Sequence, residues 1–369
     1  MYIEKLKLSN YKNHQATQLN LDERVNIFVG NNGMGKTNLL DGLYMVCYGR
    51  SYFSTKEIHI KNYDAGYYRL EAKVYKQGSH EKAVVKHDGK QKLIEVDDVA
   101  IESMVEYLGR YPVIMISPGD IELVYGGSEV RRRFLDQILS QVDKTYLKHL
   151  MAYNRVLKQR NAFLKQMGDR AKQNAHLVEA WNVQMASHGA AVFNVRHKFL
   201  EELELLFKSK YDLLGGQQDD VALSYKSQLL SDDFHEGLSK HWEKDVVLRR
   251  SNFGVHRDDI LLQKDSMLLR KVGSQGQIKT AVLALKLSQI EHIGATFGYL
   301  PIVLLDDIFD KLDPLRIKNL IKELVCEQQG QIFITDAFKL RLVDLLHDIN
   351  LPSYKVWVIQ DGEAELLEA

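Results

Sequence analysis

The stretch from Gly30 to Thr37 combines three glycines, a lysine and a threonine at a spacing that can bind phosphate. It follows the apolar run Ile27–Val29 and opens a helix-forming run, so free backbone N–H groups gather at a helix N-terminus. The spacing fits the P-loop pattern, in which Lys36 reaches the outer phosphates. An ordinary glycine-rich turn is the alternative. The predicted nucleotide-binding residues are Gly30, Asn31, Asn32, Gly33, Met34, Gly35, Lys36, Thr37 and Asn38.

A second group of chemical residues follows the apolar run Ile302–Leu305, which ends in Asp306 and Asp307. A P-loop needs a carboxylate from a neighbouring strand to hold Mg²⁺. We therefore expect Thr37 and Asp306 to be the metal ligands. We expect Asp307 to orient or deprotonate the attacking water. Two adjacent acids at a strand end are costly to bury without a cation, so the alternative of a simple capped strand end is less favourable. The predicted catalytic residues are Lys36, Asp306 and Asp307.

A third candidate phosphate-binding stretch precedes the apolar helix-forming run that begins near Ile278. Ser274, Gln275, Gly276 and Gln277 stand directly before it, which predicts a second helix start that can receive phosphate.

The segment from Val130 to Arg170 is basic although the whole chain has a formal net charge of +0. A basic stripe in a neutral protein is a candidate surface for the phosphate backbone of nucleic acid. A solvated helical face is the alternative interpretation. The candidate DNA contacts are Arg131, Arg132, Arg133, Lys144 and Lys148.

Composition limits the class of protein. A chain of 369 residues can bury a full core and suggests about two or three domains. Its two cysteines cannot form a disulfide framework, and no Cys/His spacing resembles a zinc site. No signal core or membrane-length apolar run is present, so we expect a cytoplasmic protein without membrane contact.

The order of apolar patterns predicts an α/β fold. Strands are expected around residues 3–8, 25–29, 111–116, 302–305, 331–335 and 354–359, and a helix from the glycine-rich loop to about Tyr48. Residues 67–96 alternate around the hairpin signal Asp88–Gly89, which predicts an antiparallel meander. Helical periodicity runs to about Leu214. We therefore expect a discontinuous head, residues 1–119 and 246–369, and an inserted helical arm or lid, residues 120–245.

These motifs together resemble the ABC-type ATPases. Ser274–Gln277 is similar to their signature sequence, with Gln275 in place of the first of two glycines. Phe309–Asp313 is similar to their D-loop, with Asp310 and Asp313 as its acids. The resemblance implies an ATPase head with a mixed sheet and a signature loop that touches the nucleotide of the opposite subunit. Asp336 stands at the switch position, where many of these ATPases use histidine, and its role stays open.

Within that superfamily, essentially the whole chain resembles the RecF family of bacterial DNA replication and repair proteins. The resemblance implies binding of ATP and Mg²⁺, an ATP-dependent homodimer, slow and DNA-stimulated ATP hydrolysis, and binding of single-stranded, gapped or double-stranded DNA. It also implies that RecO and RecR are partners in loading the RecA recombinase at single-strand gaps. Val255 and Gly119 depart from the family pattern. The matching stretches are Leu8–His14, Gly49–Ser54, Ser117–Asp136, Tyr153–Leu164 and Phe253–Ile260.

Two other functions remain open at this point. One is an ATP-switched interaction scaffold that does not bind DNA, which a DNA-stimulated rise in ATP turnover would exclude. The other is a nuclease with an ABC-type head. A nuclease would need a further acidic metal-binding domain, and only 34 residues follow Thr335.

Overall fold

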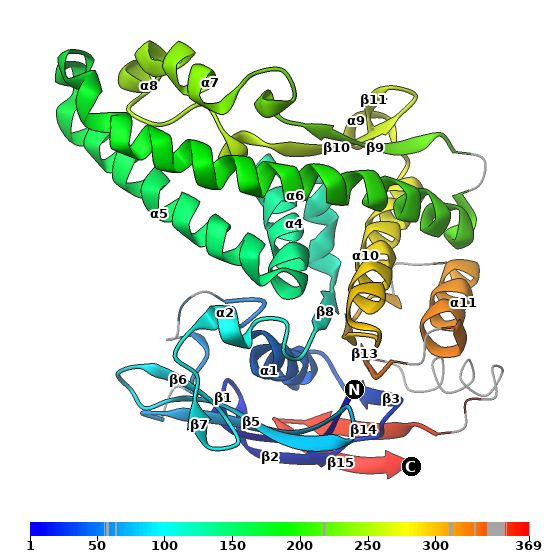
Figure 1. Ribbon diagram of the computed structural model, residues 1–369. Helices are drawn as coiled ribbons and strands as arrows, with labels where there is room; N and C mark the ends of the chain where they lie inside the picture. Colours follow the sequence, from blue (N-terminus) through cyan, green and yellow to red (C-terminus); the bar gives the residue numbers. More distant parts are fainter. Residues whose placement is uncertain are drawn as a thin grey trace. The chain divides into compact units, whose positions relative to one another are not determined.

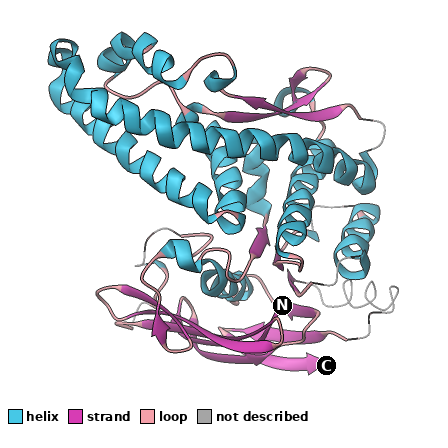
Figure 2. Ribbon diagram, viewed as in Figure 1, coloured by secondary structure: helices cyan, strands magenta, loops and turns pink. Residues whose placement is uncertain are grey.

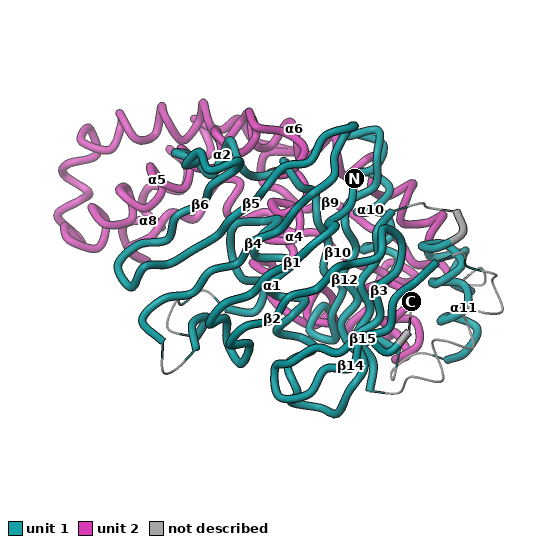
Figure 3. The backbone as a smooth tube through the Cα atoms, turned by 90° about the horizontal axis from the view of Figure 1, so that it is seen from below, with its two compact units in different colours: residues 1–120, 211–216, 283–369 teal, residues 121–210, 217–282 magenta. Residues whose placement is uncertain are grey.

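The computed structural model describes the chain except for residues 55, 57–58, 63–64, 217–218, 310–312, 328–329, 338–350, 352 and 369 (Figure 1). It consists of two compact units (Figure 3). Unit 1 contains Met1–Asp120, Tyr211–Gly216 and Leu283–Ala369, and unit 2 contains Ile121–Lys210 and Gln217–Val282. The division expected at residues 245 and 246 is therefore corrected. It would cut helix α8 (Trp242–Leu248) and separate strands that pair with one another in unit 2.

Unit 1 contains a six-stranded sheet in the order β15-β14-β3-β13-β12-β8. β15 pairs antiparallel with β14, and every other pair of neighbouring strands in this sheet is parallel. Four of its parallel strands, β3, β13, β12 and β8, have only buried residues, as their mainly apolar sequences predict. The bounds are β3 Val25–Val29, β8 Val113–Ile116, β12 Ile302–Asp306, β13 Ile332–Asp336, β14 Lys355–Gln360 and β15 Glu363–Glu368.

The second sheet of unit 1 is the predicted antiparallel meander, in the order β2-β1-β4-β5-β6-β7 (Figure 2). Its bounds are β1 Tyr2–Tyr11, β2 His14–Asn20, β4 Tyr68–Lys76, β5 Ser79–His87, β6 Lys92–Val96 and β7 Val99–Ala100. Helix α1 (Lys36–Tyr48) contacts strands of both sheets, and nearly all its residues are buried. Such a helix needs apolar residues on every side rather than on one stripe. The mixed sheet with a meander confirms the predicted fold class.

Unit 2 is built on three helices, α4 (Ser128–Val142), α5 (Lys144–Met167) and α6 (Glu179–Tyr211). Asp143 begins α5, since its carboxylate accepts hydrogen bonds from the backbone N–H groups of Thr145 and Tyr146. The predicted helical insert is confirmed, but it also contains a sheet in the order β11-β10-β9. The strands are β9 Val221–Lys226, β10 Asp259–Lys264 and β11 Met267–Leu268.

Shorter elements connect these parts, and one further long helix follows β11. That helix is α10 (Gln275–Phe297). None of the described helices is long and apolar enough to cross a membrane. The remaining elements are α2 Met104–Tyr107, η2 Pro118–Ile121, α3 Glu122–Tyr125, η3 Gly168–Val178, η4 Asp212–Gly216, η5 Gln228–Leu230, α7 Phe234–Lys240, α8 Trp242–Leu248, η6 Val255–Arg257, α9 Leu269–Val272, α11 Pro314–Lys322 and η8 Glu323–Glu327.

Candidate functional site

The glycine-rich loop joins the end of β3 to the start of α1 in unit 1. Gly33 and Gly35 have φ angles of 84° and 111°, in the left-handed region that favours glycine. A Cβ atom at Gly30 would lie 2.3 Å from the carbonyl oxygen of Ile359, so the neighbouring strand β14 leaves no room for a side chain. The backbone of the loop therefore favours glycine at positions 30, 33 and 35, whether or not a ligand is bound.

Lys36 lies inside this loop. Its ammonium group donates to the carbonyl oxygens of Gly30 at 2.5 Å and Asn31 at 3.0 Å. Burial lowers the pKa of Lys36, and the nearby carboxylates of Asp307 and Asp306 oppose that shift. A cation held at the mouth of a glycine cradle can pair with a phosphate oxygen in place of those carbonyls.

Asp306 ends β12 beside the loop and is only 5% exposed. Its Oδ1 atom accepts hydrogen bonds from the hydroxyl groups of Thr37, at 2.8 Å, and Thr335, at 2.9 Å. Burial raises the pKa of Asp306, while the two hydroxyl donors lower it. The structure thus brings together the two predicted metal ligands, Thr37 and Asp306.

Asp307 has a φ angle of 48°, which is uncommon for a residue with a side chain. Its backbone N–H donates to the Thr335 hydroxyl at 3.0 Å, so Thr335 joins both acids. Asp307 faces the same space as the glycine-rich loop. Asp307 and the glycine-rich loop border one cavity of about 310 Å³. Its lining residues are Asn32, Gly33, Gly35, Lys36, Thr37, Asn38, Asp307 and Thr335.

The β1–β2 turn contacts the glycine-rich loop through Asn13 and His14, two residues of the stretch Leu8–His14. Asn13 donates through Nδ2 to the carbonyl oxygen of Met34, at 3.1 Å, and accepts at Oδ1 from Asn38, at 2.7 Å. The ring of His14 lies between the carbonyl oxygens of Gly35, at 3.1 Å, and Gly362, at 2.7 Å. Burial lowers the pKa of His14. The family resemblance of Leu8–His14 is the sequence signal at this turn, but it does not indicate these contacts.

The predicted signature residues form the start of α10. The Ser274 hydroxyl accepts from the backbone N–H of Gln277 at 3.2 Å, and the Gln277 side chain accepts from the backbone N–H of Ser274 at 2.9 Å. This reciprocal capping box satisfies two orphan donors of a 23-residue helix. Ser274 and Gln275 are exposed, whereas Gly276 and Gln277 are half-buried. Gln277 also donates to Asp219 at 2.6 Å.

Of the two predicted D-loop acids, the structure describes Asp313. Asp313 caps α11, since its side chain accepts from the backbone N–H of Arg316. It also pairs with the Arg316 guanidinium. Asp310 lies outside the described residues.

The structure corrects the expectation that Arg131 contacts DNA. Its guanidinium is buried and donates to both carboxylate oxygens of Asp259 on β10, at 2.7 and 3.0 Å. Arg132 is half-buried and donates to the carbonyl oxygen of Asp258 at 2.7 Å. Arg133 is exposed and pairs with Glu129. Charges that hold α4 against β10 are not available to a nucleic acid.

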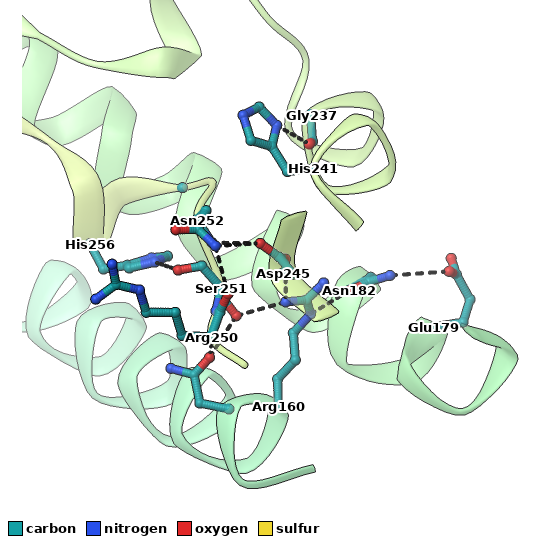
Figure 4. A network of polar contacts seen from close by, with 12 residues as sticks. Arg160, Glu179, Asn182, Gly237, His241, Asp245, Arg250, Ser251, Asn252 and His256 are labelled. Atoms are coloured by element: carbon teal, nitrogen blue, oxygen red, sulfur yellow. Dashed lines mark hydrogen bonds and ion pairs between the residues drawn. The ribbon is translucent and has the colours of Figure 1, made fainter. Parts of the chain in front are cut away.

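Arg160, another basic residue of the segment, is also structural. It is fully buried and pairs with Asp245 at 2.7 Å. Figure 4 shows the two side chains pointing toward one another. Ser251 accepts from the same guanidinium nitrogen at 2.7 Å, and Asn182 accepts from its Nε at 3.0 Å. This network ties α5 to α6 and α8 within unit 2.

The exposed basic residues of α5 remain after these corrections. The helix buries apolar side chains such as Leu147, Leu150 and Val156 at spacings of three to six residues. Its exposed basic side chains recur at spacings of three, four and seven residues, which places them on one face. We call them the α5 basic stripe: Lys144, Lys148, Arg155, Lys158 and Lys165.

Comparison with known proteins adds to this geometry. Residues 1–99 match the AAA ATPase domain family. The DNA replication and repair protein RecF of Cytophaga hutchinsonii is 37% identical over 99% of this chain and 97% of its own length. That of Parabacteroides distasonis is 36% identical over the full length of both chains.

Solved structures agree with these sequence relatives. The recombination mediator protein RecF-ATP of the RecFOR pathway is 28% identical, with a TM-score of 0.88 over 100% of this chain and 98% of that chain. An Smc head bound to the C-winged helix domain of ScpA has a TM-score of 0.56 over 100% of this chain and 98% of that chain. Its 14% identity supports a shared fold only.

Proposed function

Because the chain belongs to the RecF family of DNA replication and repair proteins, we propose that it is an ATP-dependent DNA-binding protein of recombinational repair. In this proposal ATP and Mg²⁺ bind at the glycine-rich loop, and two copies close around the nucleotide. The dimer binds DNA at single-strand gaps, helps RecO and RecR load RecA, and hydrolyses ATP slowly.

The observation that carries the proposal is the cavity around the glycine-rich loop. Glycine backbone, the Lys36 ammonium and the start of α1 all border about 310 Å³ of space. Backbone N–H groups at a helix N-terminus and a lysine suit a triphosphate. In the solved relative named RecF-ATP, the nucleotide is ATP. The side chain of Lys36 would exchange its two loop carbonyls for phosphate oxygens.

The residues around Asp306 fit Mg²⁺ in the way that nucleotide sites hold it. Among the described residues no group of three or more His, Cys, Asp or Glu side chains could hold a metal ion. Mg²⁺ commonly takes one or two protein ligands and completes its shell with phosphate and water oxygens. Thr37 and Asp306 would hold the ion, which when bound neutralises charge on the phosphates. Asp307 would orient or deprotonate the attacking water.

The exposed signature loop supports a dimer. Ser274 and Gln275 stand exposed at the N-terminus of α10, where the helix dipole favours an anion. We place this loop against the nucleotide of the second copy, with Asp313 at the seam. Loss of the shared phosphate would remove the contacts that favour the closed dimer.

The α5 basic stripe supports the DNA contact. Its lysines and arginine can neutralise successive phosphates, and the binding they give depends on salt. Lys144 and Lys148 are the two predicted DNA contacts that lie in this stripe, and both are exposed.

A nucleotide-binding experiment tests the proposal. Lys36→Ala should lose binding of a fluorescent ATP analogue in the presence of Mg²⁺. Thr37→Val should lose the Mg²⁺-dependent part of the affinity. Gapped duplex DNA should raise ATP turnover of the wild-type protein. ATP binding without any DNA-dependent rise would leave the interaction scaffold as the better interpretation, and unchanged binding by Lys36→Ala would contradict the site itself.

A further inference from the structure

Unit 2 has a second cavity, of about 310 Å³, which the proposed function does not use. It lies between the C-terminal half of α6 and strand β9. Ring contacts show that the two elements lie side by side. The Tyr225 ring of β9 stacks with the rings of Phe193 and His197 of α6, with centroids 6.0 and 6.2 Å apart. We call it the α6–β9 groove, and its lining residues are His197, Leu200, Glu201, Glu204, Leu223, Ser224, Tyr225 and Leu230.

The floor of this groove is held rigidly. The Tyr225 hydroxyl donates to Asp258 at 2.6 Å. Arg196, itself 2% exposed, donates to the same carboxylate oxygen at 2.9 Å and to Asp136 at 2.7 Å. A binding surface with a preorganised floor loses less conformational entropy when a ligand docks.

One wall of the groove is the edge of a sheet. In the three-stranded sheet β9 pairs with β10 on one side only, and among the described residues no strand pairs with its other side. An unpaired edge presents backbone N–H and C=O groups that can pair with another extended chain. Grooves between an edge strand and a helix are used in this way by domains that bind peptides.

The side chains of the groove define the chemistry of its occupant. Glu201 and Glu204 are exposed and lie on the α6 wall, and the lining contains no lysine or arginine. Leu200 and Leu223 supply buried apolar surface, and Leu230 is 51% exposed at the margin. Two carboxylates disfavour a nucleic-acid backbone and favour lysine or arginine side chains.

We infer that the α6–β9 groove binds an extended segment of a partner protein, which adds as a strand to the free edge of β9. Alternate side chains of a strand face opposite ways. The segment would therefore carry lysine or arginine at positions that face Glu201 and Glu204, and apolar residues that contact Leu200 and Leu223. This inference concerns unit 2 and is independent of the nucleotide site.

Selection from a library of random dodecapeptides on the full-length protein tests the inference. Selected peptides should carry lysine or arginine and apolar residues at alternating positions. Glu201→Lys with Glu204→Lys should weaken their binding about tenfold or more, measured by fluorescence polarisation. Glu202→Lys is a single charge-reversal control, because Glu202 is exposed on the same helix but does not line the groove. It should leave the affinity unchanged.

Two further measurements test whether the peptide binds as an added strand and whether the occupant is a peptide. Proline within the selected motif should abolish binding, because it cannot donate to a ladder. Leu230→Glu, which changes an exposed apolar residue of the groove lining, should weaken binding independently. Equal binding by the charge-reversed variant, no selected peptide, or tolerance of proline would overturn the inference. A change in the molecular mass of the charge-reversed variant would instead indicate a second copy as the occupant, and lost single-strand DNA affinity in Leu230→Glu would indicate nucleic acid. ATP binding should be the same in all variants.

Discussion

Asp306 shows at the scale of one residue how a candidate site can oppose stability. Its carboxylate is buried at the end of β12, and the threonine hydroxyl groups do not offset the burial that raises its pKa. At pH values between the ordinary aspartate pKa and the raised pKa, the Asp306 carboxyl is protonated more fully in the folded chain than in the unfolded chain. The stability contributed by the protonated carboxyl is therefore lost as the pH rises through that interval.

Asp306→Asn is therefore expected to stabilise the protein at pH 7.5 in the absence of Mg²⁺ and nucleotide. The side-chain oxygen that accepts from Thr37 and Thr335 is retained. The difference from wild type should shrink as the pH falls below the ordinary aspartate value, since both side chains are then neutral. Thermal unfolding across pH measures this.

The same variant should lose ATP turnover by about a hundredfold or more, because a metal ligand supplies several kcal/mol of charge stabilisation. A variant that is less stable than wild type at neutral pH would contradict the account of Asp306 as a carboxylate that is costly without a cation.

At the scale of elements, the β1–β2 turn supports the glycine-rich loop from outside. Asn13 bonds both Met34 of the loop and Asn38 of α1. Asn13→Ala should lower ATP affinity by up to about tenfold, since each lost hydrogen bond contributes about 1 kcal/mol.

Asn62→Ala provides the control for this prediction, measured by titration with the same ATP analogue. Asn62 donates to the carbonyl oxygen of Lys12 in the same turn, at 3.0 Å. If both variants bind ATP as wild type does, the turn does not position the loop.

The separation of contacting residues explains what could be predicted from the sequence. The glycine-rich loop, the acid pair and the strands that carry them are local patterns, and the fold class they predict is confirmed. The bond between His14 and Gly362 joins residues 348 positions apart, and no local pattern indicates it. Pairing between residues far apart in the sequence also decides which arginines are exposed to solvent. Arg131 and Arg133 look alike in the sequence, but Asp259, which lies 128 positions from Arg131, buries only the first.

At the scale of the whole molecule, the α5 basic stripe is expected to carry DNA affinity. Lys144→Glu with Lys148→Glu should weaken binding to gapped duplex. It should also reduce the slope of log affinity against log salt by about 2, because each phosphate contact contributes about 0.9. Fluorescence anisotropy at several salt concentrations measures both quantities.

Lys198→Glu with Lys208→Glu on α6 makes the same charge change at exposed positions outside the stripe. Its affinity and slope should stay close to those of wild type. An equal loss in both double variants would assign the effect to net charge rather than to the stripe.

The central claim is that the signature loop of one copy completes the nucleotide site of another. Molecular mass by light scattering, with ATP and Mg²⁺, tests it most directly. The wild-type mass should rise from 42.5 kDa to twice that value. Ser274→Arg should bind ATP normally, stay at 42.5 kDa and lose turnover. A Ser274→Arg protein that doubles its mass with ATP as the wild type does, or one that no longer binds ATP, would contradict the claim.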